Sequence, residues 1–272
     1  MVSLNKNNQT AIDYVTNFID GQWLENNNGG FKYYNIGYNN INVEEYKLPC
    51  LQEQKNVCCY CSRLIDNSPE TELEHIIPRA VNDTVTLQQY FNYSLILSQS
   101  IVLQNSFSEA TTQQAPPPFP HHIAYQNILA SCNGKTINTS EDTTCCNRNR
   151  GNEFIPPFNL INNCIAYNND GSIYYVEDDI HNQYINHLNL NKALLKNIRR
   201  IWFLFANSDV TEDLLLQANT IEEFKEVFSI YIDVNPLKTF AESNTIDSFK
   251  TEANWNLLLK YRYFLNYFRN NN

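Results

Sequence analysis

Two groups of cysteines constrain the fold of this 272-residue chain more than any other feature of its sequence. The groups are Cys58, Cys59 and Cys61, and then Cys132, Cys145 and Cys146. The Cys-x-x-Cys pair of Cys58 and Cys61 has the spacing of a tight knuckle whose thiolates reach one tetrahedral Zn²⁺ at about 2.3 Å. Two more thiolates from the second group would close the coordination sphere. We therefore predict a structural zinc site that stabilises a region with little apolar core of its own.

The choice of ligand within each group stays open. Cys59 is only two residues from Cys61 and fits the knuckle less well, whereas Cys145 and Cys146 are equally placed by spacing. We take Cys58, Cys61, Cys132 and Cys146 as the predicted set. Cys50 and Cys164 are interpreted as small buried hydrophobic side chains, which is also the alternative interpretation for every cysteine here.

The charge balance excludes a protein that coats nucleic acid by bulk attraction, since 19 Lys and Arg stand against 29 Asp and Glu, a formal charge of -10. Residues 1–10 are polar and lack the apolar core of a signal peptide, and no apolar run is long enough to span a bilayer. We expect a cytoplasmic protein without membrane contact. A reducing compartment argues against a disulfide framework and favours metal for clustered cysteines.

Patterning along the chain predicts an α+β protein in three parts. Residues 1–57 form an N-terminal segment that packs on the core, with a turn at 26–30. Residues 58–157 hold nearly every reactive side chain, with an insertion near 84–120 in which Gln113–Pro120 is too proline-rich for a helix or a central strand.

Residues 158–272 are predicted to be mostly helical after a hairpin strand at 173–176. Apolar residues recur at helical spacing over 189–205 and near the C-terminus. In the C-terminal stretch Leu258, Tyr261, Leu265 and Phe268 share one face, so we interpret them as core. This region is also the expected docking surface for a partner, through Trp202, Phe203 and Tyr263.

Three blocks of polar residues interleave with the cysteines in a fixed order. The first is Glu72-Leu73-Glu74-His75-Ile76-Ile77-Pro78-Arg79, the second runs from Asn127 to Cys132, and the third is Cys146-Asn147-Arg148-Asn149-Arg150-Gly151. A Cys-x-x-Cys, an acidic residue with His before a proline, an Asn before an apolar step into Cys, and Cys-Asn-x-x-basic-Gly together resemble the HNH (ββα-metal) nucleases. Two features depart from that pattern. The second half-knuckle is stretched far beyond Cys-x-x-Cys, and Arg150 stands where Lys is usual.

The resemblance implies a ββα-metal core and a role for each matching residue. Glu74 and Asn147 would bind a catalytic Mg²⁺ or Mn²⁺, with Asn149 as the alternative ligand if the stretched knuckle shifts the register. His75 would activate water, and Asn127 would orient the imidazole or pin the loop. In an extended strand Glu74 and His75 point to opposite faces, so the strand must bend or end there for both to reach one site.

The chemistry is consistent with these residue types. Phosphodiester hydrolysis requires an activated water and charge stabilisation on the phosphoryl and leaving oxygens. Neutral imidazole suits the first task, and a hard, oxygen-seeking cation suits the second. Arg79, Arg148 and Arg150 are candidates for binding phosphates. We expect His121 and His122 on a loop surface, and His181 and His187 in structural or exposed positions.

A wider resemblance covers residues beyond the three blocks. Asp170-Gly171-Ser172-Ile173 followed by Leu188-Asn189-Leu190-Asn191, with Leu195 and Arg199 beyond, is similar to the HNH nucleases of Septu and retron antiphage systems. This implies an endonuclease acting on DNA, or on RNA, with an ABC-type ATPase as partner. Two alternatives remain: a zinc-knuckle module for nucleic-acid binding or assembly with a degenerate centre, and a structural zinc protein with redox-sensitive thiols.

Overall fold

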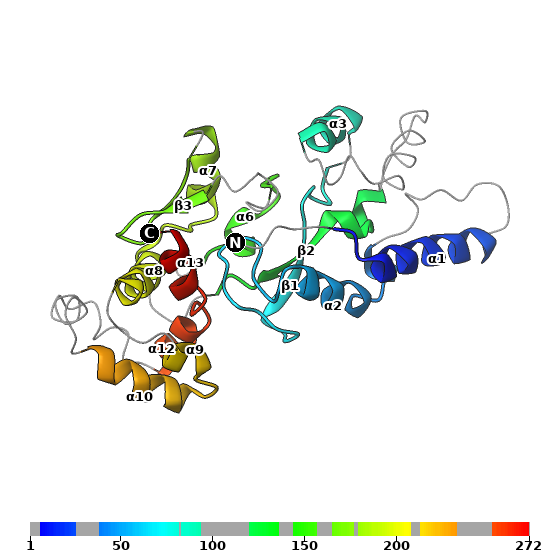
Figure 1. The fold of residues 1–272 in the computed structure, drawn as a ribbon. Coiled ribbons are helices and arrows are strands. Elements are labelled where there is room, and N and C mark those ends of the chain that lie inside the picture. Colours follow the sequence, from blue (N-terminus) through cyan, green and yellow to red (C-terminus); the bar gives the residue numbers. More distant parts are fainter. Residues whose placement is uncertain are drawn as a thin grey trace.

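The computed structural model describes residues 6–25, 38–81, 83–93, 120–135, 144–156, 165–176, 179–207, 213–232 and 252–271. They form an elongated α+β molecule (Figure 1). The helices are α1 (Gln9–Glu25), α2 (Glu44–Glu53), α3 (Thr84–Tyr93), α6 (Asn147–Arg150), α7 (Asp179–His187), α8 (Ala193–Ala206), α9 (Asp213–Gln217), α10 (Ile221–Ile232), α12 (Glu252–Leu259) and α13 (Phe264–Asn271). The strands are β1 (Thr71–His75), β2 (Ile128–Cys132), β3 (Ile165–Tyr167) and β4 (Ile173–Tyr175), and short 3-10 helices cover Tyr38–Asn40, Pro120–His122 and Tyr125–Asn127.

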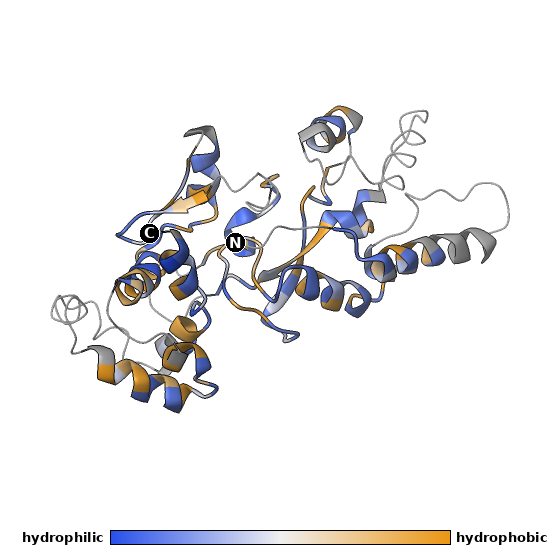
Figure 2. Ribbon diagram, in the orientation of Figure 1, coloured by the Kyte–Doolittle hydropathy of each residue, from blue (hydrophilic) through white to orange (hydrophobic). Residues whose placement is uncertain are grey.

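The centre of the molecule is an antiparallel pair of strands followed by a short helix. β1 pairs with β2 so that Thr71 lies opposite Cys132 and His75 opposite Ile128. Every residue of β2 is buried, as its apolar sequence leads one to expect, and Figure 2 shows this strand as mainly hydrophobic beside a hydrophilic α6. The chain leaves β1 and returns to β2 only after a long excursion that includes α3. The candidate site residues of β1 are thus held against a fully buried strand.

The N-terminal helices cover β2 on one side. Gln54, directly after α2, donates from its amide to the carbonyl of Ala130 and accepts from the Ala130 N–H, at 2.7 and 2.8 Å. This side chain pairs with β2 much as a neighbouring strand would. Ala11 of α1 and Tyr46 and Cys50 of α2 are buried, so these two helices of the N-terminal segment pack on the core.

The C-terminal region consists of a hairpin and a helical cluster. β3 pairs with β4, in agreement with the strand predicted at 173–176. α8 begins at Ala193, later than the predicted 189, because Asn189 has a positive φ of 53° and ends a turn. The apolar face predicted near the C-terminus is buried, but α12 and α13 share it, and the chain turns between them.

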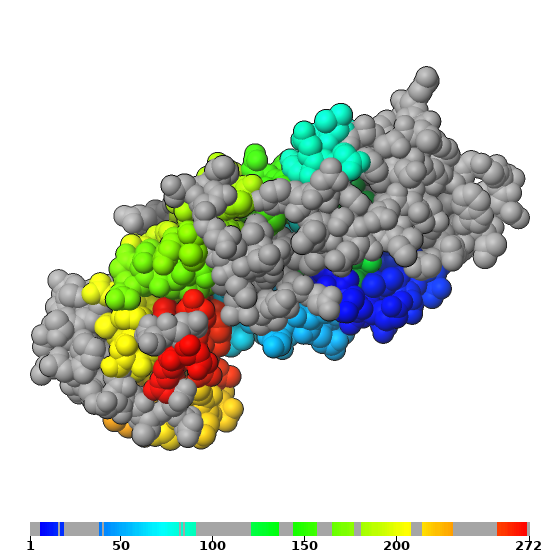
Figure 3. All heavy atoms as spheres, turned by 45° about the horizontal axis from the view of Figure 1, so that its top comes forward, coloured from blue at the N-terminus to red at the C-terminus, as the bar shows by residue number. Residues whose placement is uncertain are grey.

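The helical cluster packs against the central unit. The Leu64 N–H donates to the Lys260 carbonyl at 2.8 Å, and the Cys146 N–H donates to the Leu188 carbonyl at 3.0 Å. Figure 3 shows α8 and α13 together at one end of the molecule and α1 at the other. Trp202 is fully buried, so the prediction that it offers a docking surface is wrong; Phe203 and Tyr263 are partly buried.

Within the part of the chain that the structure describes, no helix is both long and apolar enough to cross a membrane. Several predictions fall outside those residues: the turn at 26–30, the proline-rich stretch as far as residue 119, and the burial of Cys164. Of the predicted insertion, α3 and the return from Pro120 are described.

Candidate metal centre and catalytic cleft

Four buried cysteines converge beside the strand pair. The sulfurs of Cys58, Cys61, Cys132 and Cys146 all lie within 4.8 Å of one another, and those of Cys61 and Cys132 are 3.8 Å apart. Four ligands at about 2.3 Å from a tetrahedral Zn²⁺ have sulfurs about 3.8 Å apart. These are the four residues chosen from the sequence, and they could bind a metal ion such as zinc.

The backbone around the first pair has the hydrogen bonds of a tight knuckle. The Ser62 N–H donates to the Cys58 carbonyl at 3.1 Å, the Cys58 N–H donates to the Arg63 carbonyl at 2.8 Å, and Ser62 has a positive φ of 63°. The Cys132 N–H points at the Cys58 sulfur, 3.3 Å away. An amide directed at a sulfur favours the thiolate form that a metal ligand requires.

Cys145 lies at the edge of this cluster. Its sulfur is 3.5 Å from that of Cys146, but it is outside the set whose sulfurs share one centre. Gly134 permits the close packing that brings the second group in, because a Cβ there would lie 2.0 Å from the Cys145 carbonyl oxygen. The geometry therefore favours Cys146 over Cys145.

A buried arginine accompanies the cysteines. Burial alone would lower the pKa of Arg63, but the thiolates of Cys132 and Cys61 outweigh it and raise that pKa. Four thiolates around one divalent ion carry a net charge of −2. A cation held beside them offsets part of that charge in a region shielded from water.

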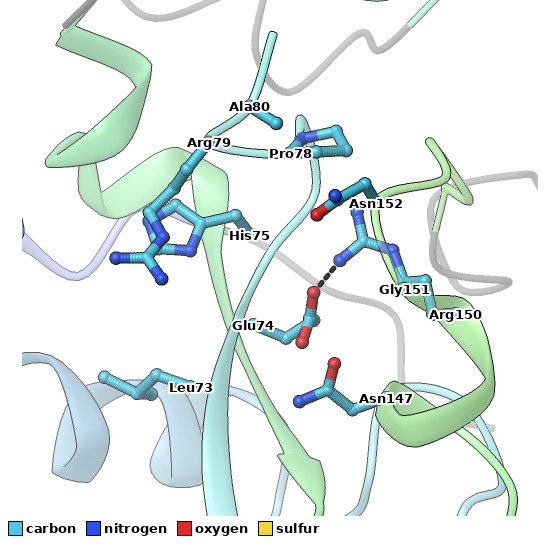
Figure 4. A pocket seen from close by; sticks show the side chains of 10 residues that line it. All are labelled: Leu73, Glu74, His75, Pro78, Arg79, Ala80, Asn147, Arg150, Gly151 and Asn152. Carbon is cyan, nitrogen blue, oxygen red and sulfur yellow. Dashed lines mark ion pairs between the residues drawn. The ribbon is translucent and has the colours of Figure 1, made fainter.

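The strands β1 and β2 and the helix α6 lie around a second site, an open cleft of about 520 Å³. Its lining includes Glu74 and His75 from β1, Asn147 and Arg150 from α6, and Arg79 from the loop after β1 (Figure 4). Glu74 and His75 are the last two residues of β1, and Figure 4 shows their side chains on opposite sides of the strand, His75 with Arg79 and Glu74 with Asn147 and Arg150. Of the predicted catalytic residues, Asn127 is outside this lining, and so is Arg148 among the predicted phosphate contacts.

The imidazole of His75 is held in one tautomer. Its Nε2 lies 2.9 Å from the carbonyl oxygen of His122, and because a carbonyl can only accept, Nε2 carries the proton and Nδ1 the lone pair. Burial lowers the pKa of His75 to about 3; the bond to His122 opposes this shift and the Arg79 guanidinium adds to it. The ring is therefore neutral near pH 7 with its lone pair on Nδ1, and the same burial makes it a weak base unless a negative charge binds nearby.

The ring of Tyr38 packs edge-on against the imidazole, with centroids 4.8 Å apart and planes at 72°. The Arg79 guanidinium lies over the Tyr38 ring, 5.2 Å from its centroid. Tyr38 comes from the N-terminal segment and His122 from the return to β2, so two distant parts of the sequence position His75. No motif in the sequence identified Tyr38.

Asn127 is fully buried and bonds to the loop backbone. Its side-chain oxygen accepts from the Ile77 N–H at 2.8 Å, and its amide nitrogen donates to the carbonyls of Ile77 and His121 at 3.1 and 2.7 Å. Of the two roles considered for it, these bonds match pinning of the loop. They also fix the segment whose His122 carbonyl holds His75.

Glu74 is buried and forms an ion pair with Arg150, drawn as a dashed line in Figure 4. The Arg150 guanidinium also donates to the Ile76 carbonyl at 2.7 Å, and Arg150 as a whole is only 1% exposed. Arg150 lines the cleft, so its predicted contact with phosphate stays a prediction, although its charge already has a partner inside the protein. Its charge is balanced inside the protein by Glu74, which burial makes necessary.

Asn147 lies next to Glu74 at the start of α6. Its amide nitrogen donates to a carboxylate oxygen of Glu72 at 2.8 Å, so its amide oxygen is the atom left for the cleft. Figure 4 shows that oxygen turned toward the Glu74 carboxylate. Both atoms are acceptors, an arrangement that suits a cation between them. Glu72, which orients Asn147, was not singled out from the sequence.

The remaining candidate residues are distributed around the cleft. Arg79 is exposed and lines it, whereas Arg148 is exposed elsewhere and donates to the Asn133 carbonyl at 3.2 Å. Asn149 does not line the cleft. The expected loop-surface position of His121 is wrong, because it is 3% exposed and its Nε2 lies 3.3 Å from the Pro78 carbonyl oxygen.

The other histidines differ from one another in exposure. His122 is partly exposed and lies against His121, with ring centroids 4.4 Å apart, so the surface prediction holds for it only in part. His187 is exposed and His181 is partly buried against Tyr175.

Comparison of the chain with protein-family models, with curated proteins and with solved structures found no match.

Proposed function

We propose that this chain is a metal-dependent endonuclease of the HNH type that hydrolyses DNA phosphodiester bonds. One observation carries the proposal. A neutral imidazole of fixed tautomer, His75, shares a cleft with two side-chain oxygens that face each other, those of Glu74 and Asn147. Metal-assisted hydrolysis requires a proton acceptor and oxygen ligands for a metal ion, and the cleft offers both.

The chain's own residues divide the reaction between them. His75 accepts a proton from the attacking water at Nδ1, and a phosphate bound nearby raises its affinity for that proton. Glu74 and Asn147 would hold Mg²⁺ or Mn²⁺, which, when bound, stabilises charge on the phosphoryl and leaving oxygens. Arg79, exposed at the edge of the cleft, binds the phosphate backbone.

The four cysteines would hold a structural Zn²⁺. With Cys58, Cys61, Cys132 and Cys146 as ligands the coordination sphere is closed, so water and substrate have no access to this ion. The site joins the knuckle before β1 to the end of β2 and the start of α6. It thereby fixes the three elements that carry the cleft.

The biological setting follows from the resemblance and the charge. We propose that the nuclease is the effector of a bacterial antiphage complex and works in the cytoplasm with an ABC-type ATPase. A chain with a formal charge of -10 attracts DNA poorly over long distances, and a basic partner would compensate.

A second candidate is a nucleic-acid-binding or assembly module with the same zinc knuckle and no catalysis. The ion pair between Glu74 and Arg150 favours it, because a carboxylate already neutralised inside the protein is a weaker ligand for a cation. The first candidate accounts better for the fixed tautomer of His75, for which a binding module has no use.

Cleavage assays separate the two candidates. The zinc-loaded chain is incubated with supercoiled plasmid, single-stranded DNA and RNA, with Mg²⁺ or Mn²⁺ and with EDTA as control. Each reaction is run alone and with an ABC-type ATPase of the proposed kind. The nuclease proposal predicts metal-dependent cuts in DNA that EDTA abolishes. Binding of nucleic acid without cleavage under every condition would instead support the second candidate.

A further inference from the structure

A second pocket adjoins the catalytic cleft and is not used by the proposed reaction. It has a volume of about 340 Å³, within the range of small-ligand sites. Three parts of the chain build it: Tyr90 on α3, residues 153–155, and α7. The segment after α6 forms the boundary, since Asn152 lines the cleft and Glu153 lines the pocket.

A hydrogen bond also connects the two spaces. His187 lines the second pocket, and its Nε2 lies 3.2 Å from the carbonyl oxygen of Arg150, which lines the cleft. Because a carbonyl oxygen only accepts, Nε2 of His187 is the donor in this bond. A ligand long enough to leave the cleft past residues 151–153 therefore meets this pocket next.

The walls suit a flat aromatic ring. Tyr90 and Phe154 are stacked, with centroids 4.0 Å apart and planes at 13°, and both line the pocket. Tyr184 from α7 contributes a third aromatic side chain. A base laid on such a stack gains stacking energy whatever its identity, as in proteins that bind single strands.

The polar groups of the pocket suit a base and not a phosphate. None of the described residues that line it is Lys or Arg, and Glu153 contributes a carboxylate. The side-chain oxygens of Glu153 and Gln183 are acceptors that match exocyclic amino groups. The cations needed for phosphate, by contrast, lie at the cleft, where Arg79 is exposed.

We propose that this pocket binds an unpaired nucleobase of the strand whose phosphate occupies the catalytic cleft, with adenine, cytosine or guanine preferred over thymine. The inference rests on the proposed nuclease function and narrows its substrate. At least one nucleotide beside the cut must be out of the double helix, because a paired base cannot enter a pocket of this size. Single-stranded or locally opened DNA is then the substrate class.

Binding without cleavage tests the pocket. Fluorescently labelled single-stranded oligonucleotides are titrated with the full chain in EDTA, and anisotropy gives the Kd. One abasic position at a time is moved along the strand, numbered from the cut mapped with Mn²⁺. The wild-type chain should lose about 5- to 150-fold in affinity at one position beside the cut, equivalent to the 1–3 kcal/mol of one stacked base.

The variants test the residues directly. Tyr90→Ala should weaken binding of the intact strand by the same factor and make that abasic position neutral, whereas Tyr90→Phe and the exposed-site control Tyr174→Ala should bind like the wild type. Glu153→Gln should reduce the preference for cytosine and adenine over thymine at that position. If Tyr90→Ala loses its zinc or its circular dichroism spectrum, Glu153→Gln decides the question.

Three results would overturn the inference. They are a flat abasic scan, wild-type binding by both Tyr90→Ala and Glu153→Gln, and binding of free dAMP or dCMP as tightly as the oligonucleotide, which would indicate a mononucleotide site. Any of these with intact metal-dependent cleavage leaves the nuclease proposal standing. Failure of the wild-type chain both to bind and to cut nucleic acid would instead remove the nuclease proposal and the inference with it.

Discussion

The side chain of Asn127 satisfies three backbone groups of the loop that follows β1. Its bonds to Ile77 and His121 hold the two ends of a long excursion together, and the neighbouring His122 carbonyl holds His75. All of these groups are out of water. At the residue scale, the proposed catalysis would depend on a side chain that does not itself line the cleft.

Asn127→Ala should lower the free energy of unfolding by about 2–4 kcal/mol, because it leaves buried donors and acceptors without partners. Denaturant titration measures the change. Asn186→Ala, at an exposed position of α7, is the matched control and should change the free energy of unfolding by less than about 0.5 kcal/mol. An Asn127→Ala protein as stable as this control would contradict the account of the loop.

Asn147→Ala should raise the Mn²⁺ concentration needed for half-maximal cleavage, with partial recovery at high metal, since one oxygen ligand is lost and the proton acceptor remains. Glu72→Gln should raise it by about 10- to 100-fold at most, as expected for a group that orients a ligand. A metal titration of each variant gives the values. Asn149→Ala is the control, and a shift there without one in Asn147→Ala would show that the ligand register is wrong.

At the scale of elements, the cysteine cluster connects segments that have few other local reasons to stay together. α6 is four residues long, too short to be stable alone, and Cys146 directly precedes it. The knuckle at Cys58 and Cys61 similarly holds the turn before β1. Metal at this centre should therefore support the fold and, through it, the cleft.

Cys58→Ser should reduce the zinc content from about one ion per chain and lower the Tm, because three remaining thiolates bind far more weakly than four. Elemental analysis and thermal unfolding measure both effects. Cys145→Ser, adjacent to the cluster but outside it, should retain zinc. Zinc retained after combined Cys58→Ser and Cys132→Ser changes would exclude this site.

The sequence predicted those parts of the site that depend on short spacing. The four cysteines that converge were identified, as were the residues of β1 and α6 that line the cleft. The surface prediction failed for His121, which the long return between the strands buries, and nothing in the sequence indicated that Arg150 pairs with Glu74 inside the protein. Non-local packing of this kind leaves no periodic signal in the chain.

At the scale of the whole molecule, charge opposes the proposed substrate. The formal charge is -10, and of the arginines assigned to phosphate only Arg79 is both exposed and in the cleft. The attraction between Arg79 and a phosphate must then overcome the repulsion between the acidic chain and DNA. Salt screens both interactions.

The isolated chain should cut plasmid at least about tenfold more slowly than the chain with its ATPase partner at physiological salt, because a basic partner supplies the attraction that the nuclease lacks. Initial rates with and without the ATPase measure the difference. Bovine serum albumin in place of the ATPase controls for protein concentration. Equal rates, with no binding between the two proteins by calorimetry, would contradict the proposed partnership.

The most direct test of the central claim compares the wild-type chain with His75→Ala in a metal-dependent cleavage assay. The imidazole is outside the cysteine cluster, so zinc content and the circular dichroism spectrum should not change. Loss of the proton acceptor should lower the cleavage rate by about 100- to 10,000-fold. A folded, zinc-loaded His75→Ala chain that cuts DNA at the wild-type rate would contradict the claim that this cleft is the active site of a nuclease.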